Sequence, residues 1–234
     1  MSFNRIGIIG AMPNEIAKLR KRLVDMKTEK RGAWHFYIGK LCGKEVVLVQ
    51  SGLCKVNMAA CTQAIIDYYE VDCLINSGIA GGVSPAVNIG DIVISRDCLQ
   101  HDVDAVVFGY KPGQIPQMKT TTFKADETLV AAARAACKKV YPEVNMFSGR
   151  ILTGDVFICE RQKKDDLLDT FGGICTEMEG AAMGQVAHIN KVPFVIVRTI
   201  SDNADDSAGM VYEEFEVLAI ERMVEITTEL VAQL

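Results

Sequence analysis

The chain has 234 residues, of which 25 are Lys or Arg and 30 are Asp or Glu, giving a formal net charge of -5. About half of the residues (49%) are apolar and about a quarter (24%) are charged, a balance typical of a soluble globular protein and not of a disordered one. The mild acidity argues against a nucleic-acid binder, because such proteins usually carry a basic patch. The length predicts one domain over residues 1–234, large enough to fold without a disulfide or metal staple.

The cysteines and histidines indicate a reduced protein without a metal centre. Eight cysteines are scattered along the chain and never form a C-x-x-C pair, and the three histidines are widely separated. No apolar run approaches the roughly 18 residues of a membrane span, and the run from Ile6 to Met12 lacks the features of a signal peptide. We therefore expect a cytoplasmic protein with no metal, no membrane partner and no nucleic-acid partner.

Short apolar runs alternate with helical periods along the chain. In chain order we predict a strand at Arg5–Gly10, a helix from about Pro13 to Met26, strands at His35–Leu41 and Glu45–Gln50, a helix at Val56–Tyr69, strands at Asp72–Asn76 and Asp91–Ser95, a helix at Asp126–Val140, strands at Met146–Leu152 and Phe194–Ile200, and a helix from about Glu213 to Val231. This alternation predicts an α/β domain with a mixed, mostly parallel central sheet and helices on both faces.

Chemically suggestive residues follow four of these apolar runs. Ligands in such folds bind beyond the carboxyl ends of the strands, so polar residues there are the first candidates for a site. Glu15 lies in the first turn of the helix after the first strand, and a Gly-rich segment, Ser77-Gly78-Ile79-Ala80-Gly81-Gly82, follows Asn76. Taken alone, the first is an ordinary carboxylate at a helix start and the second is a tight turn.

The other two segments add more carboxylates. In an extended Glu177-Met178-Glu179, the two glutamates point the same way, and such close charges need donor partners, for which a ligand hydroxyl is suitable. Asp202 directly follows the last strand, and we expect the nearby Asp205 and Asp206 to raise its pKa, which would make it a proton donor near neutral pH. The structural alternatives are a solvated strand end and an Asp-rich helix cap. Together, the four segments predict acid–base cleavage of a bond to a good leaving group.

Six motifs, taken in their order along the chain, resemble those of one enzyme family. They are Ile8-Ile9-Gly10-Ala11-Met12-x-x-Glu15, Ser51-Gly52-Leu53-x-Lys55-Val56, Asn76-Ser77-Gly78-Ile79-Ala80-Gly81-Gly82, Gly90-Asp91-Ile92-Val93, Glu177-Met178-Glu179 and Arg198-x-Ile200-Ser201-Asp202. Over residues 5–234 the chain resembles the 5′-methylthioadenosine/S-adenosylhomocysteine nucleosidases of the nucleoside phosphorylase superfamily. The sequence departs from their usual pattern at Cys54, where glycine is common, and at Pro13, Asn14 and Ile79.

The resemblance implies hydrolysis of the N-glycosidic bond of thio-substituted adenine nucleosides, in methionine salvage, without a cofactor. It implies that Asp202 protonates purine N7, that Glu15 activates the attacking water, and that Glu179 binds the ribose hydroxyls. Holding Asp202 protonated near pH 7 needs an upward pKa shift of roughly three units, which burial and neighbouring charge can supply.

The resemblance also assigns substrate-binding residues. Met178 would pack against the sugar, Phe157 would stack on adenine, the Ile158 backbone would read the edge of the base, and Arg198 would help to fix the water. Further residues would line the base, sugar and alkylthio regions: Ala80, Gly81, Ile79, Glu177, Leu53, Phe108 and Tyr212, with Pro116 supplied by the partner subunit of a homodimer.

Three alternatives stay open. A nucleoside phosphorylase of the same fold must bind phosphate, but Glu15 in the loop after the first strand would repel that anion, and no arginine follows until Arg20. A hydrolase acting on aminodeoxyfutalosine would use the same catalytic residues. A protein that binds nucleosides without turnover is disfavoured, because the chain keeps Glu15, Glu179 and Asp202 together.

Overall fold

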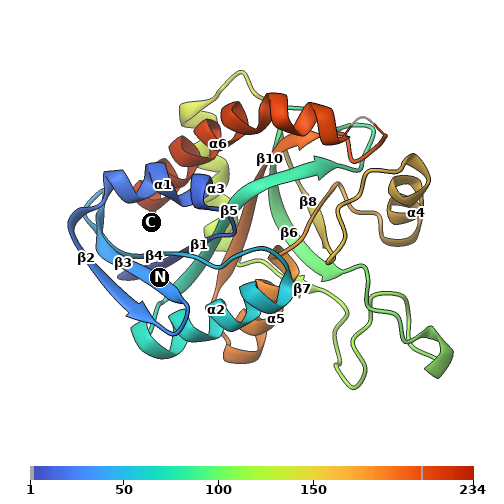
Figure 1. The fold of residues 1–234 in the computed structure, drawn as a ribbon, viewed down its shortest axis with the longest axis horizontal. Helices are drawn as coiled ribbons and strands as arrows, with labels where there is room; N and C mark the ends of the chain where they lie inside the picture. Colours follow the sequence, from blue (N-terminus) through green and yellow to red (C-terminus); the bar gives the residue numbers. More distant parts are fainter. Residues whose placement is uncertain (1–2, 207) are drawn as a thin grey trace.

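A computed structural model describes residues 3–206 and 208–234, apart from the side chains of residues 210–214. It shows an α/β domain in which helices cover both faces of a twisted sheet (Figure 1). This is the predicted fold class.

Part of the sheet closes on itself. In this part, β10 (Phe194–Asp202), β6 (Ile92–Gln100), β8 (Met146–Thr153), β9 (Cys175–Glu177) and β5 (Cys73–Gly82) follow one another, and β10 pairs with β5 as well, which completes the ring. An open wing continues from β5 through β1 (Arg5–Gly10), β4 (Lys44–Gln50), β3 (Trp34–Leu41) and β2 (Val24–Arg31), while the short β7 (Phe123–Lys124) pairs with β6. The ring and the wing therefore share β5.

The pairing is mixed, as predicted. Parallel pairs join β1 to β4 and β5, β10 to β5, and β8 to β6 and β9. Antiparallel pairs join β2, β3 and β4 in the wing, and also β10 to β6 and β9 to β5 in the ring. Parallel strands β1, β5 and β10 consequently deliver their carboxyl ends to the same edge of the sheet.

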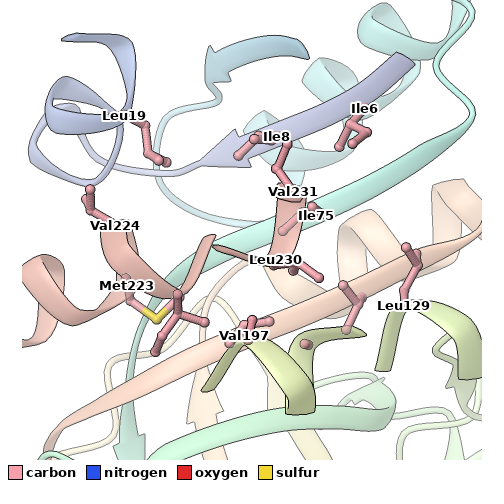
Figure 2. Packing of buried hydrophobic residues seen from close by; sticks show 14 of the residues in the cluster. Ile6, Ile8, Leu19, Ile75, Leu129, Val197, Met223, Val224, Leu230 and Val231 are labelled. Carbon is pink, nitrogen blue, oxygen red and sulfur yellow. The ribbon is translucent and has the colours of Figure 1, made fainter. Parts of the chain in front are cut away.

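Helices pack on both faces because the central strands are apolar on both sides. Ile6 and Ile8 of β1 face the cluster formed with α1 (Pro13–Arg22), α3 (Glu127–Val140) and α6 (Ala208–Gln233), whereas Ile9 faces the cluster formed with α2 (Lys55–Tyr69) and α5 (Gly180–Asn190). Figure 2 shows the first cluster, where Leu230 and Val231 of α6 approach the strands. Continuous apolar runs are typical of strands that are covered on both faces.

The predicted elements are largely present, with differences at their ends. The helix predicted from Pro13 to Met26 is wrong beyond Arg22, because α1 ends there and Val24–Arg31 forms the edge strand β2. The β2 side chains are mostly exposed and polar, so no apolar alternation marks the strand, and charged residues are a common protection of a sheet edge. The α4 helix (Arg161–Phe171) was not predicted, and β5 and β6 extend well beyond the predicted Asn76 and Ser95.

A long connection between β6 and β7 protrudes from the body. It carries the short 3₁₀ helix η1 (Val106–Phe108) and extends away from the sheet in Figure 1. Val107 and Phe108 are 87% and 80% exposed, unusual for apolar side chains that lie next to each other. We call residues 103–118 the protruding segment.

Within the described part of the chain, none of the helices combines the length and the apolar character that a membrane crossing requires.

Candidate active site

The ends of four strands surround one cavity of about 350 Å³. Its walls come from the segments after β1, at the end of β5, around β9 and at the end of β10, with additions from two loops. The lining residues are Ala11, Met12, Glu15, Leu53, Ile79, Ala80, Gly81, Phe157, Thr176, Glu177, Met178, Glu179, Ser201 and Asp202. The four segments singled out in the sequence therefore meet in one place.

Glu15 is fixed by the helix start on which it lies. Its Oε2 accepts hydrogen bonds from the backbone N–H groups of Ala11 (2.6 Å) and Met12 (2.9 Å), so the carboxylate satisfies free donors at the N-terminus of α1. Burial raises the pKa of Glu15, against the opposing effects of the Met12 N–H group and the charge of Arg198. The result is a rigid carboxyl group that takes up a proton more readily than an exposed glutamate does.

Glycine at position 78 makes room for this carboxyl group. A Cβ atom at Gly78 would lie only 2.6 Å from Oε1 of Glu15 and 3.3 Å from Nη1 of Arg198. Any larger residue would therefore displace one of the two charged groups. The Gly-rich segment is therefore part of strand β5 and not the tight turn considered from the sequence, and glycine at this position lets the strand approach Glu15 closely.

Asp202 lies at the end of β10, opposite Gly81. Its Oδ2 accepts from the Ser201 hydroxyl (2.9 Å) and its Oδ1 accepts from the Ala204 N–H group (2.8 Å). The side chain is almost fully buried, and burial raises the pKa of Asp202 although both hydrogen bonds oppose this effect. The negative charge of Asp205 adds to the increase, as predicted for that residue, whereas Asp206, for which the same effect was expected, is exposed and is not one of the main contributors.

Glu177 forms the centre of a buried polar network. Its carboxylate is paired with Arg198, accepts from the Thr153 hydroxyl, and accepts from the backbone N–H groups of Glu179 (3.2 Å) and Gly180 (2.7 Å). The backbone donors are at the start of α5, where the helix dipole favours a negative charge. Arg198 also donates to the side-chain and backbone oxygens of Asn76, so this network joins β5, β8, β9 and β10.

Glu179 differs from Glu177 in its backbone geometry and in its hydrogen-bond partners, although only one residue separates the two. The strand ends at Glu177 and the backbone of Glu179 has φ -136° and ψ -39°, so the extended geometry expected from the sequence does not continue. Oε1 of Glu179 accepts from the Cys54 N–H group at 2.7 Å. Burial raises the pKa of Glu179, and the nearby negative charge of Glu177 raises it further.

The remaining predicted residues divide into four groups. Ile158 lines a small adjoining hollow together with Gly81, Phe157 and Asp202. Arg198 lies behind the cavity and reaches it through Glu177. Phe108 and Pro116 lie on the protruding segment, outside the lining formed by the described residues of this chain. The side chain of Tyr212 is outside the described residues.

Sequence reasoning assigned no role to several residues that build this site. Ser201 and Thr153 orient the carboxyl groups of Asp202 and Glu177, Asn76 holds Arg198, and Thr176 contributes to the wall. Thr153, Thr176 and Ser201 lie at or near the carboxyl ends of buried strands, which is the signal that could have identified them, whereas Asn76 lies within β5. Within the described ranges, no group of three or more His, Cys, Asp and Glu side chains is arranged to hold a metal ion.

The arrangement suits acid–base chemistry on a neutral, partly apolar ligand. Three carboxyl groups with raised pKa values, those of Glu15, Glu179 and Asp202, line the same small cavity. Perturbed groups that converge in a cleft are typical of catalytic sites, because a pKa near the working pH suits both proton donors and proton acceptors.

Comparison with known proteins agrees with this site. The family model described as the phosphorylase superfamily matches residues 5–232. The chain is 41% identical over 212 residues to a 5′-methylthioadenosine/S-adenosylhomocysteine nucleosidase from Tolumonas auensis, covering 90% of this chain and 91% of the relative. A similar relative from Shewanella loihica is 42% identical over 216 residues, covering 92% of this chain and 93% of the relative.

The fold agrees equally well with a solved structure. The crystal structure of the Neisseria meningitidis 5′-methylthioadenosine/S-adenosylhomocysteine nucleosidase in complex with methylthio-immucillin-A superimposes with a TM-score of 0.95 at 36% identity, covering 99% of this chain and 100% of that chain. The chain therefore belongs to the phosphorylase superfamily and, within it, to the 5′-methylthioadenosine/S-adenosylhomocysteine nucleosidases.

Proposed function

We propose that this protein hydrolyses the N-glycosidic bond of 5′-methylthioadenosine and S-adenosylhomocysteine and releases adenine. The observation that carries the proposal is the convergence of Glu15, Glu179 and Asp202 on one cavity of about 350 Å³, a size at the lower end of pockets for small molecules. In the reaction the C1′–N9 bond breaks, the hydroxyl group of a water molecule adds to C1′, and a proton goes to the base.

Asp202 acts as the general acid. Adenine is a poor leaving group as an anion, and protonation at N7 lets it leave as a neutral molecule. Burial raises the pKa of Asp202, so the carboxyl group retains its proton at a higher pH than an exposed aspartate does. The hydrogen bonds from Ser201 and Ala204 fix the orientation of the carboxyl group.

Glu15 orients the attacking water and removes a proton from it. The helix start holds one carboxylate oxygen, and Arg198 supplies a nearby positive charge that keeps a negative Glu15 available as a base. Departure of adenine leaves positive charge on the ribose ring. The buried carboxylates stabilise this charge because they are already in place when it develops.

Glu179 binds the ribose hydroxyls, and Met178 packs against the sugar. We assign a different task to Glu177. Its carboxylate already bonds Arg198, Thr153 and the start of α5, so it holds the base-side wall together and contributes to binding through these groups.

The adenine base lies between Phe157 and the β5 segment. Phe157 stacks on the ring, the Ile158 backbone reads its edge, and the β5 residues Ile79, Ala80 and Gly81 form the opposite wall. A Cβ atom at Gly81 would lie 2.8 Å from Oδ1 of Asp202, so glycine there gives the acid access to the base.

The alkylthio tail extends past Leu53 toward solvent. Leu53 is half exposed at the rim, which leaves the tail region incomplete within one chain. We propose that a homodimer completes it, with Phe108, Pro116 and Tyr212 as the further apolar contacts and with Pro116 coming from the partner subunit. The exposed Val107 and Phe108 are compatible with such an interface. We propose the cytoplasm as the site of the reaction.

Hydrolysis is favoured over phosphorolysis by the position of Glu15. A buried carboxylate beside the attacking position repels a phosphate dianion but can activate a neutral water molecule. The test is adenine release from 5′-methylthioadenosine by purified protein in phosphate-free buffer. We expect full activity without phosphate and a free thioribose product. A requirement for phosphate, or a sugar 1-phosphate product, would overturn the hydrolase. A parallel assay with aminodeoxyfutalosine determines whether the tail region accepts that nucleoside as well.

A further inference from the structure

The ribose carboxylate depends on a strained piece of backbone. Glu179 accepts from the Cys54 N–H group, and Cys54 has φ 74° and ψ 166°, a conformation that residues with a Cβ atom rarely adopt. Such strain persists only where the surroundings hold the backbone in place. The groups that hold Cys54 therefore also set the position of Glu179.

Lys55, the next residue, is anchored at both of its ends. Its backbone N–H group donates to Oδ1 of Asp155 at 2.8 Å. Its Nζ atom is 2.6 Å from Oδ1 of Asp102 and 3.0 Å from Oε1 of Gln100. The Lys55 and Asp102 side chains are only 18% and 23% exposed, so this ion pair is largely shielded from solvent.

The three residues form a closed ring of contacts. Oδ2 of Asp102 accepts from the Asp155 N–H group at 2.9 Å, which joins the two carboxyl-bearing residues to each other as well as to Lys55. The hydrogen bonds and the charge of Lys55 keep the pKa of Asp102 below its usual range in spite of burial, so its carboxylate is negative at neutral pH. We call Lys55, Asp102 and Asp155 the anchoring triad.

Each residue of the anchoring triad lies close in sequence to a different part of the site. Lys55 follows Cys54, whose N–H group bonds Glu179. Asp155 comes two residues before Phe157, which lines the cavity. Asp102 comes two residues after the end of β6, directly before the protruding segment. None of the three residues lines the cavity itself.

We infer that the anchoring triad positions the ribose-binding carboxylate and the base-stacking loop relative to each other, and that it thereby sets the affinity for the nucleoside without touching it. This inference rests on the proposed function for its substrate. The bonded ring of Lys55, Asp102 and Asp155 carries it, because a shift of any member moves both the Cys54 N–H group and the loop that carries Phe157.

The first test is Lys55→Met, which keeps the apolar length of the side chain and removes its charge and donors. Loss of one partner from a largely shielded pair leaves an unpaired charge on Asp102, so the ring should loosen. We expect KM for 5′-methylthioadenosine to rise about tenfold with kcat within about threefold, and Lys55→Arg to restore most of the affinity. The matched control is Lys139→Met, which removes the Lys139–Glu229 ion pair between α3 and α6 and should leave KM unchanged.

The second readout does not depend on catalysis. In Lys55→Met, we expect hydrogen exchange at the Cys54 and Asp155 amides to accelerate about tenfold, because the ring that protects them is open more often. If the wild-type protein releases no adenine, the proposed function fails, and exchange at these two amides alone decides on the anchoring triad. If Lys55→Met does not fold, Asp102→Asn replaces it, since asparagine keeps the size and loses the charge.

The inference is overturned if exchange at both amides is unchanged. It is also overturned if KM in the folded variant stays within about twofold of the wild type, whether or not kcat falls. A loss of kcat alone would mean that these residues act on the reacting step and not on nucleoside affinity.

Discussion

The cavity and the protruding segment differ in how complete they are within one chain. The carboxyl groups of Glu15, Glu179 and Asp202 are buried, and each accepts a hydrogen bond from a backbone N–H group of the same chain. Phe108, by contrast, is 80% exposed on a segment that extends away from the sheet. One chain therefore holds the groups assigned to bond cleavage in place by itself. The groups assigned to the alkylthio tail stay exposed in one chain and need a second surface to bury them.

The largest expected effect comes from the interior. Asp202→Asn keeps the shape and one acceptor oxygen but removes the proton donor. We expect kcat for adenine release to fall about a thousandfold, within the range that general acid catalysis contributes, while the melting temperature changes little. Steady-state kinetics with 5′-methylthioadenosine measures this effect.

The control for that experiment is Asp206→Asn, an exposed residue four positions later that should retain full activity. Near-normal activity of Asp202→Asn would remove Asp202 from the acid role. It would also mean that the buried carboxyl groups of the cavity are not what bond cleavage depends on.

A smaller effect is expected from the protruding segment. Phe108→Ser removes a large apolar side chain that is exposed in the single chain and that we propose to contribute to the tail region. We expect KM to rise roughly tenfold with kcat nearly unchanged, because burial of a phenylalanine side chain is worth about 1.5–3 kcal/mol. Analytical ultracentrifugation of the same variant should show weaker dimerisation.

Val24→Ser is the matched control for Phe108→Ser. Val24 is also strongly exposed, but it lies on the edge strand β2 and does not line the cavity. It should change neither KM nor the sedimentation behaviour. If Phe108→Ser behaves like Val24→Ser, the tail region is complete without the protruding segment.

The smallest effect concerns stability and its dependence on pH. The raised pKa of Glu179 means that the folded state binds its proton more tightly than the unfolded state does. The resulting stabilisation is fully present below the ordinary pKa of 4.5 and is lost as the pH rises through the raised value. Glu179→Gln keeps an acceptor oxygen for the Cys54 N–H group but does not titrate.

Glu179→Gln should therefore gain stability relative to the wild type as the pH rises. Between about pH 4 and about pH 9 we expect its melting temperature to gain several degrees on the wild type, because each pKa unit between the folded and unfolded states is worth about 1.4 kcal/mol and each kcal/mol shifts the melting temperature of a chain of this size by about 2–4 °C. Glu143→Gln, on the exposed connection between α3 and β8, should show no such gain. A difference in melting temperature that stays constant across this pH range would contradict a raised pKa of Glu179 in the folded protein.

Much of the fold was predictable because buried strands leave a strong signal. Strands made of continuous apolar runs, such as Arg5–Gly10 and Phe194–Ile200, expose apolar side chains to water unless both of their faces are buried. A sheet between two layers of helices buries both faces. The edge strand β2 left no such signal. Its exposed, charged residues continue the polar pattern of α1, so the end of that helix was placed at Met26 and not at Arg22.

The site was predictable as a set of residues but not as a network. Glu15, Glu179 and Asp202 follow strands, and the sequence order of their motifs suffices to bring them together. The pairing of Glu177 with Arg198 depends on two strands that are separated by β5, and the ring of Lys55, Asp102 and Asp155 depends on the start of α2 and two loops. Local pattern contains no information on contacts of this kind.

Strand β5 has a consequence for how such a chain can change length during evolution. It borders β1, β9 and β10, and its register places Gly78 against Glu15 and Gly81 against Asp202. Inserting or deleting a single residue in β5 would rotate its side chains to the other face and disturb both acidic groups at once. Related sequences should therefore vary in length within residues 103–118 and preserve the length of β5.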